Sequence, residues 1–359
     1  GRNYGGVLAD VIWAVFQEDY QAGYGADGDH LKSPDEVKMA LDYGFTMITL
    51  DCSEYINNLA QTDLEGIDKH YQALDAKQRQ ELEAEFVGKQ FPVGPGMTLE
   101  FTPELLKFNA AVYQKAIDFA ASIFMTLIKP VADKVEFEVS IDETQTSTLP
   151  SSHFFVAEQL VKAGVKISSM APRFYGEFQK GIDYIGDLAQ FEQEFLEHVK
   201  IAEHFGYKLS IHSGSDKFAV FPIIGRETKG RVHVKTAGTN WLEAVKVIIV
   251  ADPGLYRELH QFALESLAEA KKYYHIKGDP AKIADLKSLS DEQLKDLMQQ
   301  DDARQVIHIT YGRILQAKDA QGNSRFSDRV YQCLNENEEL FYKFLQEHIG
   351  KHLQLLGVK

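Results

Sequence analysis

The chain has 359 residues, of which 44% are hydrophobic and 25% charged, a composition typical of a globular protein with a large core. Its net charge of -15 argues against nucleic-acid or anionic-membrane partners, because both would be repelled and no local basic patch is visible. The two cysteines form no Cys-x-x-Cys pair, and neither a long uninterrupted apolar run nor a secretory leader is visible. We therefore expect a reducing, cytoplasmic address without disulfides or a thiolate zinc site.

The first elements alternate between helix and strand. The segment Ser33-Pro-Asp-Glu36 combines a capping hydroxyl, a proline and an acid three residues after the cap, which predicts a helix start, and Gly44 ends that helix. Residues 45–51 follow as a strand with Thr49 and Asp51 on one face. This close succession is typical of an α/β protein.

A helical insertion near residues 60–130 comes next, with helices predicted at 67–86 and 103–127 and a loop at 91–96. Residues 135–143 then show the clearest strand alternation of the chain. One face carries Glu136, Glu138, Ser140 and Asp142. These acids are either catalytic or part of a salt-bridge ladder with lysines of neighbouring strands.

The remaining units repeat the rhythm of helix and strand. We predict helices at about 152–162, 188–205, 241–250 and 253–274, a polar helical excursion at 277–302, and a C-terminal helix at 326–355. Strands are expected at 165–170, before His212, around His233 and around His308. Three histidines at three strand ends predict one convergent pocket.

Counting 24–31 as a glycine-rich strand gives seven candidate strands. We therefore predict a single TIM-type (β/α)8 barrel domain over residues 1–359, with helical insertions near 60–130 and 277–302 and a C-terminal helix. An open doubly wound sheet is the alternative. No G-x-G-x-x-G or Walker pattern supports that alternative as a nucleotide-binding fold.

The segment Asp27-Gly-Asp-His30 concentrates two carboxylates and an imidazole in a tight turn. It is either simple turn chemistry or a site in which His30 binds a metal and Asp29 acts as a base. Neutral imidazoles and a carboxylate suit Zn2+, Mn2+, Fe2+, Co2+ or Ni2+ and leave a position open for substrate. The predicted ligand set is His30, His212 and His233, with Glu177 or Asp142 as the carboxylate. Each histidine taken alone is more often a packed core or surface group.

Two carboxylates on opposite sides of a metal-bound ketone can remove a proton and return it to the other face. Asp142 lies nearest the carboxyl end of its strand, and Glu138 would reach up from mid-strand. The anionic or hydroxylated parts of a substrate would be held by Arg173, Lys217, Lys235, Asn240 and His308.

Five motifs together resemble the tagaturonate/fructuronate epimerases. They are Gly-Ala-Asp-Gly-Asp-His-Leu-Lys at 25–32, Glu-Val-Ser-Ile-Asp-Glu-Thr at 138–144, Arg-Phe-Tyr-Gly-Glu-Phe at 173–178, Ser-Ile-His-Ser-Gly-Ser-Asp-Lys at 210–217 and His-Val-Lys-Thr-Ala-Gly-Thr-Asn-Trp at 233–241. The resemblance implies a divalent-metal enzyme of hexuronate catabolism that interconverts D-tagaturonate and D-fructuronate, two small-molecule ketouronates. It also implies an N-terminal segment ahead of this region, so that a first barrel strand is absent from this chain.

Two other readings stay open at this point. A metal-assisted aldolase or ketose isomerase acting on a sugar acid would use much the same ligands. A non-catalytic sugar-acid-binding barrel would use none of the acids for chemistry, since a fold does not fix a function. Deuterium uptake from D2O with inversion marks the epimerase, cleavage products mark the aldolase, and absence of exchange marks the binding protein.

Overall fold

The computed structural model describes residues 3–58, 63, 66–236, 238–274 and 276–358. The chain divides into two compact units. The first comprises Gly1–Tyr175 and Ala189–Ser210, and the second comprises Gly176–Leu188 and Ile211–Lys359. Each unit is described separately below.

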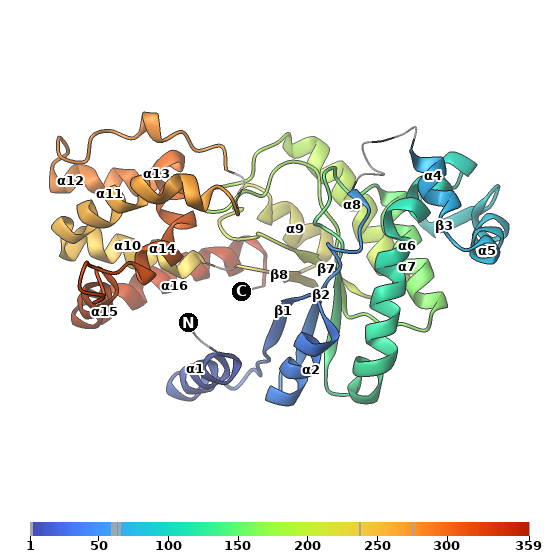
Figure 1. Cartoon of the computed structure of the whole chain (residues 1–359), viewed down its shortest axis with the longest axis horizontal. Coiled ribbons are helices and arrows are strands. Elements are labelled where there is room, and N and C mark those ends of the chain that lie inside the picture. Colours follow the sequence, from blue (N-terminus) through green and yellow to red (C-terminus); the bar gives the residue numbers. More distant parts are fainter. Residues whose placement is uncertain (1–2, 59–62, 64–65, 237, 275, 359) are drawn as a thin grey trace. The chain divides into compact units, whose positions relative to one another are not determined.

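A parallel sheet forms the centre of the first unit (Figure 1). The sheet order is β1-β2-β5-β6-β7-β8, and the strands are β1 Asp27–Leu31, β2 Met47–Asp51, β5 Glu136–Ser140, β6 Ser169–Ala171, β7 Lys208–Ile211 and β8 Val232–Val234. The last residue of β7 and all of β8 belong to the second unit. There Lys235 donates its main-chain N–H to the carbonyl of Ile211 at 3.0 Å.

The predicted eight-stranded barrel is therefore wrong. Six parallel strands form one open sheet, with β1 and β8 at its edges, and a separate two-stranded sheet completes the strands of the described residues. Closure of a barrel depends on strand number and stagger, which are properties of the whole sheet and not of any single strand pattern. The strand predictions themselves were correct in six of seven cases.

The first helix–strand pair forms as its local chemistry predicts. α2 (Pro34–Tyr43) begins with a capping box in which the Ser33 hydroxyl accepts from the Glu36 N–H, and it ends at Gly44 in the left-handed conformation with φ 90°. Val37 and Ala40 of α2 are fully buried, as are Ile48 and Leu50 of β2, all on the apolar side of this pair. The other face of β2 is thereby left to Thr49 and Asp51.

The helical insertion of the first unit packs beside the sheet. Its elements are α4 Ile67–Gln72, α5 Ala76–Phe86, β3 Gln90–Gly94, β4 Met97–Glu100, α6 Pro103–Ile123 and the short turns η1 Phe124–Ile128 and η2 Lys129–Val131. The loop predicted at 91–96 is instead an antiparallel hairpin of β3 and β4. Pro92 lies within β3, and because proline has no N–H to donate it is tolerated in an edge strand, which each strand of a two-stranded sheet is.

One stretch of the described chain, Pro103–Val131, is long and apolar enough to cross a membrane by length and composition. However, 56% of its most apolar window is buried inside the protein. α6 contacts α4 and α7 (Pro150–Lys162), which is the packing of a core helix. The other helices of the first unit are α1 Tyr4–Gln17 and most of α8 Leu188–Phe205.

Buried residues between Leu242 and Cys333 form one hydrophobic cluster in the second unit (Figure 1). This unit has helices on both sides of β8 in the chain. They are α9 Phe221–Thr228, α10 Thr239–Ala251, α11 Pro253–Ala270, η3 Pro280–Lys282, α12 Asp291–Leu294, η4 Lys295–Gln299, α13 Asp301–Ile309, α14 Tyr311–Gln316, α15 Ser327–Glu336 and α16 Glu338–Leu355. The strand predicted around His308 is wrong, because this residue lies in α13. Val306, Ile307 and Ile309 are buried in the helical core, and a short apolar run suits either structure.

Candidate active site

A row of polar side chains crosses one face of the sheet in the first unit. The hydroxyl of Thr49 donates to both carboxylate oxygens of Asp27, at 3.0 and 2.8 Å, and lies 3.4 Å from Glu138 Oε1. The hydroxyl of Ser169 donates to the other oxygen of Glu138 in a short contact. The strand register aligns Thr49, Glu138 and Ser169, so the four groups belong to neighbouring strands β1, β2, β5 and β6.

Glu138 is fully buried in this row. A carboxylate in such a place is stable only when its oxygens receive hydrogen bonds; the Ser169 hydroxyl supplies one, and the Thr49 hydroxyl shares its proton between Asp27 and Glu138. The alternative prediction for the β5 acids was a salt-bridge ladder with lysines of neighbouring strands. Glu136 makes such a contact, with its carboxylate 3.4 Å from Lys208 Nζ.

Two residues after Thr49, at the end of β2, Asp51 contacts His30 of β1. The distance from His30 Nδ1 to Asp51 Oδ2 is 3.1 Å, and the second oxygen of Asp51 accepts the N–H of Ser53 at 2.8 Å. Burial alone would raise the pKa of Asp51, but the hydrogen bonds from His30 and Ser53 and the charge of Lys32 outweigh it and hold the pKa well below its ordinary range. An ionised Asp51 keeps the proton of His30 on Nδ1 and directs Nε2 away from the carboxylate.

His30 has an unusual backbone for a residue in a strand. Its φ is 55°, in the left-handed region, and the register of β1 against β2 is irregular between Gly28 and Leu31. Such irregularities re-aim a side chain and persist where the surroundings hold them. A carboxylate behind an imidazole is also the arrangement that orients metal-binding histidines.

The three predicted catalytic acids all lie in the first unit. Asp29 is 39% exposed and its carboxylate is 4.0 Å from His30 Nε2, whereas the carboxylate of Asp142 receives the hydroxyl of Ser140 at 2.5 Å. β1 and β5 are separated by β2 alone, so Asp29 and the end of β5 are roughly 10 Å apart at about 4.8 Å per strand. Two acids with a small molecule between them fit that spacing.

Arg173 fastens two loops beyond the strand ends. Its guanidinium donates to the carbonyl of Thr144 in a short contact, and its N–H donates to the Thr148 hydroxyl at 2.9 Å. The N–H of Thr148 donates in turn to the carbonyl of Arg173 at 2.8 Å. A role for Arg173 in substrate binding stays a prediction.

The remaining predicted residues lie in the second unit. His212 follows β7 and is 8% exposed, His233 lies in β8, Lys235 follows β8, and Asn240 is exposed in the first turn of α10. The N–H of Gly214 donates to the carbonyl of Lys235 at 2.9 Å, which joins the segments that carry His212 and His233. Their roles as ligands and substrate contacts stay predictions.

Glu177 and Lys217 have strong partners inside the second unit. The Glu177 carboxylate is 2.6 Å from Lys277 Nζ and accepts from the Gln179 amide at 2.5 Å. Lys217 is fully buried, and its ammonium donates to the carbonyls of Gln179, Ile182 and Ser215 at 2.8, 2.6 and 2.8 Å. A ligand role for Glu177 and a substrate role for Lys217 would need these contacts to be exchanged.

His308 is 5% exposed and close to two glycines in the left-handed conformation. A Cβ on Gly238 would lie 2.8 Å from His308 Cε1, and one on Gly181 would lie 3.2 Å from His308 Cβ. Burial, followed by the charge of Lys180, lowers the pKa of His308 to about 4, with Asp216 opposing the shift. The ring is therefore neutral at pH 7.

Two functional candidates were not singled out by the sequence prediction, Asp27 and Asp51. The alternation that placed Asp51 and Thr49 on one face was the available signal, but it does not by itself predict the contact between Asp51 and His30. The thiol of Cys52, by contrast, is fully buried, and burial together with the charge of Asp51 raises its pKa well above the ordinary value.

Comparison with known proteins adds independent findings. The profile of the tagaturonate epimerase family matches residues 1–356. The chain is 43% identical over 357 residues to the tagaturonate/fructuronate epimerase of Thermotoga maritima, which covers 99% of this chain and 72% of that protein. Crystal structures of a fructuronate-tagaturonate epimerase from Cohnella laeviribosi cover 100% of this chain and 73% of theirs: the native form has 52% identity and a TM-score of 0.98, and a complex with one glycerol has 53% and 0.97.

Proposed function

The chain belongs to the tagaturonate epimerase family and is therefore an isomerase, and we propose that it interconverts D-tagaturonate and D-fructuronate with a divalent metal ion. The structural observation that carries the metal proposal is the contact of His30 with the ionised Asp51 at the end of a sheet face lined with carboxylates. Family membership supports the substrate. The acids on the sheet face support proton transfer as the chemistry.

The two sugar acids have their ketone at C2 and differ in configuration at C4. Removing the C3 proton while O2 gains one gives an enediol, and returning a proton to C2 while the C3 hydroxyl loses its own moves the carbonyl to C3, with no net change in atoms or electrons. The C4 proton then lies next to a carbonyl, so that one carboxylate can remove it and a second carboxylic acid can return a proton from the opposite face. Reversing the first steps restores the C2 ketone in the epimer.

Asp29, Glu138 and Asp142 are the acids proposed for these transfers. Asp29 lies in β1 and Asp142 lies two residues after the end of β5, with β2 between these strands, so the two acids are proposed to approach a substrate from two sides. Glu138 is held by the hydroxyls of Thr49 and Ser169, which fix its carboxylate in one orientation. Such fixed groups are expected to contribute about 10²- to 10⁴-fold each to the rate.

The proposed metal ligands are His30, Glu177, His212 and His233. Their imidazole nitrogens and carboxylate oxygens suit Zn2+, Mn2+, Fe2+, Co2+ or Ni2+, and the Asp51 carboxylate behind His30 fits a ligand histidine. Such an ion, when bound, would polarise the substrate carbonyl and acidify the neighbouring C–H bond. Arg173, Lys235, Asn240 and His308 are proposed to hold the substrate carboxylate and hydroxyls, whereas the ammonium protons of Lys217 are already taken by three carbonyls.

Conversion of D-tagaturonate to D-fructuronate, followed by nuclear magnetic resonance, tests the proposal. We expect conversion by the metal-loaded chain, loss of conversion after chelation and recovery with a divalent ion. Asp142→Asn should lower turnover by about 10²- to 10⁴-fold, whereas Asp133→Asn, at an exposed carboxylate in the turn ahead of β5, should not. Full turnover in the chelated protein would contradict the metal dependence, and parental turnover in Asp142→Asn would contradict the role of that acid.

A further inference from the structure

The turn that follows His212 is strained. Two of its residues, Ser213 and Asp216, have φ of 52° and 60°, in the left-handed region that residues other than glycine rarely adopt. Between them, a Cβ on Gly214 would lie 2.5 Å from Val234 Cγ1, so only glycine fits there. Strained residues cost about 1–3 kcal/mol each and persist only when their surroundings hold them.

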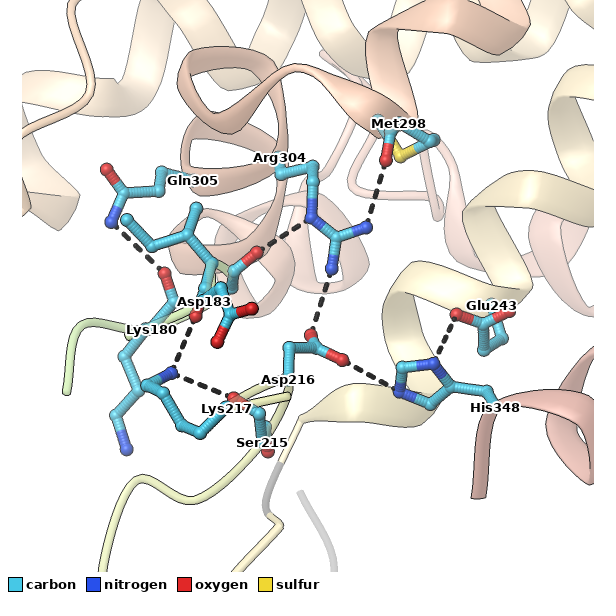
Figure 2. Close-up of polar contacts among 12 residues, drawn as sticks. Lys180, Asp183, Ser215, Asp216, Lys217, Glu243, Met298, Arg304, Gln305 and His348 are labelled. Atoms are coloured by element: carbon cyan, nitrogen blue, oxygen red, sulfur yellow. Dashed lines mark hydrogen bonds and ion pairs between the residues drawn. The ribbon is translucent and has the colours of Figure 1, made fainter. Parts of the chain in front are cut away.

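The carboxylate of Asp216 provides the first hold on this turn (Figure 2). It is 96% buried and lies 2.9 Å from Arg304 Nη2 of α13 and 3.0 Å from His348 Nε2 of α16. The Asp216 N–H also donates to Nε2 of His352, at 3.2 Å. The residue is therefore fixed through its main chain and through both oxygens of its side chain.

The partners of Asp216 are themselves fixed. Arg304 also donates to the carbonyls of Gly181 and Met298, at 2.8 and 3.0 Å, and His348 Nδ1 lies 3.4 Å from Glu243 of α10 (Figure 2). Nδ1 of His352 lies 2.8 Å from the carbonyl of His348. Side chains of α13 and α16 thus hold Asp216 directly, and α10 supports it through His348.

Lys217 provides the second hold. Each of the three ammonium protons has a carbonyl acceptor, and one of these carbonyls belongs to Ser215 in the turn itself. Burial lowers the pKa of Lys217 to about 8, against the opposing charges of Asp216 and Asp183, so the group still carries its proton at pH 7. The Lys217 ammonium is enclosed by main-chain carbonyls and so links the 179–182 segment to the turn after His212.

We propose that Asp216 and Lys217 are positioning residues that hold the strained turn and thereby fix the backbone of His212 for metal binding. The inference rests on the proposed function, since it takes His212 as a ligand. Neither side chain needs to touch the substrate or the ion. Loss of either should let the turn relax toward unstrained backbone angles and move His212 out of place.

The test compares Co2+ affinity, measured by titration of the visible absorption, in the metal-free full chain and its variants. Asp216→Asn and Lys217→Met should weaken Co2+ binding by about 10- to 100-fold, the loss typical of removing support from behind a metal ligand. Glu258→Gln is the matched control, because Glu258 forms a bidentate ion pair with Arg329 in the same unit at 2.8 and 3.0 Å. It should leave the affinity unchanged.

The outcomes separate this inference from the proposed function. If His212→Ala weakens Co2+ binding but folded Asp216→Asn and Lys217→Met bind like the parent, the positioning role is wrong and the ligand role of His212 stands. If His212→Ala binds like the parent, both are wrong. Should Lys217→Met fail to fold, Lys217→Ala measured with and without ethylammonium replaces it. We expect the added cation to restore Co2+ affinity, and full affinity without the amine would overturn the proposal.

Discussion

Acidification from pH 7 to pH 5 should destabilise the first unit through two buried histidines. His153 of α7 and His198 of α8 are 0% and 1% exposed, and their Nδ1 atoms lie 2.9 Å apart. Tyr207 donates to the other nitrogen of His153, and His198 donates to the backbone carbonyl of Thr148. Each hydrogen-bonding proton in this series from Tyr207 to Thr148 therefore has one acceptor, and both imidazole rings are neutral.

The pKa shifts of the two histidines determine how much stability is lost on acidification. Burial, and next the neighbouring His198, hold the pKa of His153 well below 6.5, while burial lowers that of His198 to about 4 against the opposing hydrogen bond to Thr148. The unfolded chain takes up protons below pH 6.5 and the folded chain does not, so stability is complete above that pH and falls as the pH drops toward 4. Between pH 7 and 5 the loss is about 2 kcal/mol for each ring.

Urea unfolding of the parent and of His198→Gln at both pH values measures the effect. Glutamine can donate to Thr148 and accept from His153 without titrating in this range. The parent should lose about 2 kcal/mol more than the variant between pH 7 and 5. His70→Gln, at a part-exposed histidine of α4, should keep the parental dependence. Equal pH dependence in the parent and His198→Gln would refute the reasoning.

Three further changes have defined outcomes. Asp51→Asn should weaken metal binding by about 10- to 100-fold in a metal titration, because the imidazole it orients loses its charged partner. Gly238→Ala should lower the free energy of unfolding by about 1 kcal/mol or more beyond Gly322→Ala, since both have positive φ but only the first would place a Cβ 2.8 Å from His308. Burial raises the pKa of Asp216, but His348 and Arg304 outweigh it and lower this pKa to about 2. The ionised carboxylate should therefore contribute about 2 kcal/mol to stability above pH 4, and this contribution should be lost between pH 4 and 2. Acid unfolding curves of Asp216→Asn should lack it.

The elements that sequence predicts best are those specified by neighbours in the chain. The capping box at Ser33 and the glycine stop at Gly44 identify α2 because every participant lies within a dozen residues. Alternation likewise identifies β5 and the polar side that bears Glu138. The segment around His308 was misassigned because a short apolar run suits a strand or a buried helix, and the choice is made by the helices that pack on it.

The parts of the site that sequence could not predict depend on distant backbone. Lys217 was expected to bind substrate, yet two of its three acceptors are carbonyls 38 and 35 residues away, which have no signature in the side-chain sequence. The contact between His30 and Asp51 depends on the irregular register of β1, a feature that arises only when the two strands pair. Whether the sheet closes into a barrel or stays open likewise depends on how all the strands pair, and not on the residues of any one strand.

The measurement that tests the central claim most directly is the fate of the C4 hydrogen when D-tagaturonate is converted in D2O. Inversion by two carboxylic groups requires that the C4 proton leave and that a solvent-derived proton return, so the D-fructuronate formed should carry deuterium at C4. Inversion by cleavage and re-formation of the C3–C4 bond would retain the original C4 hydrogen. Product with hydrogen at C4 after full conversion would contradict the proposed proton transfer.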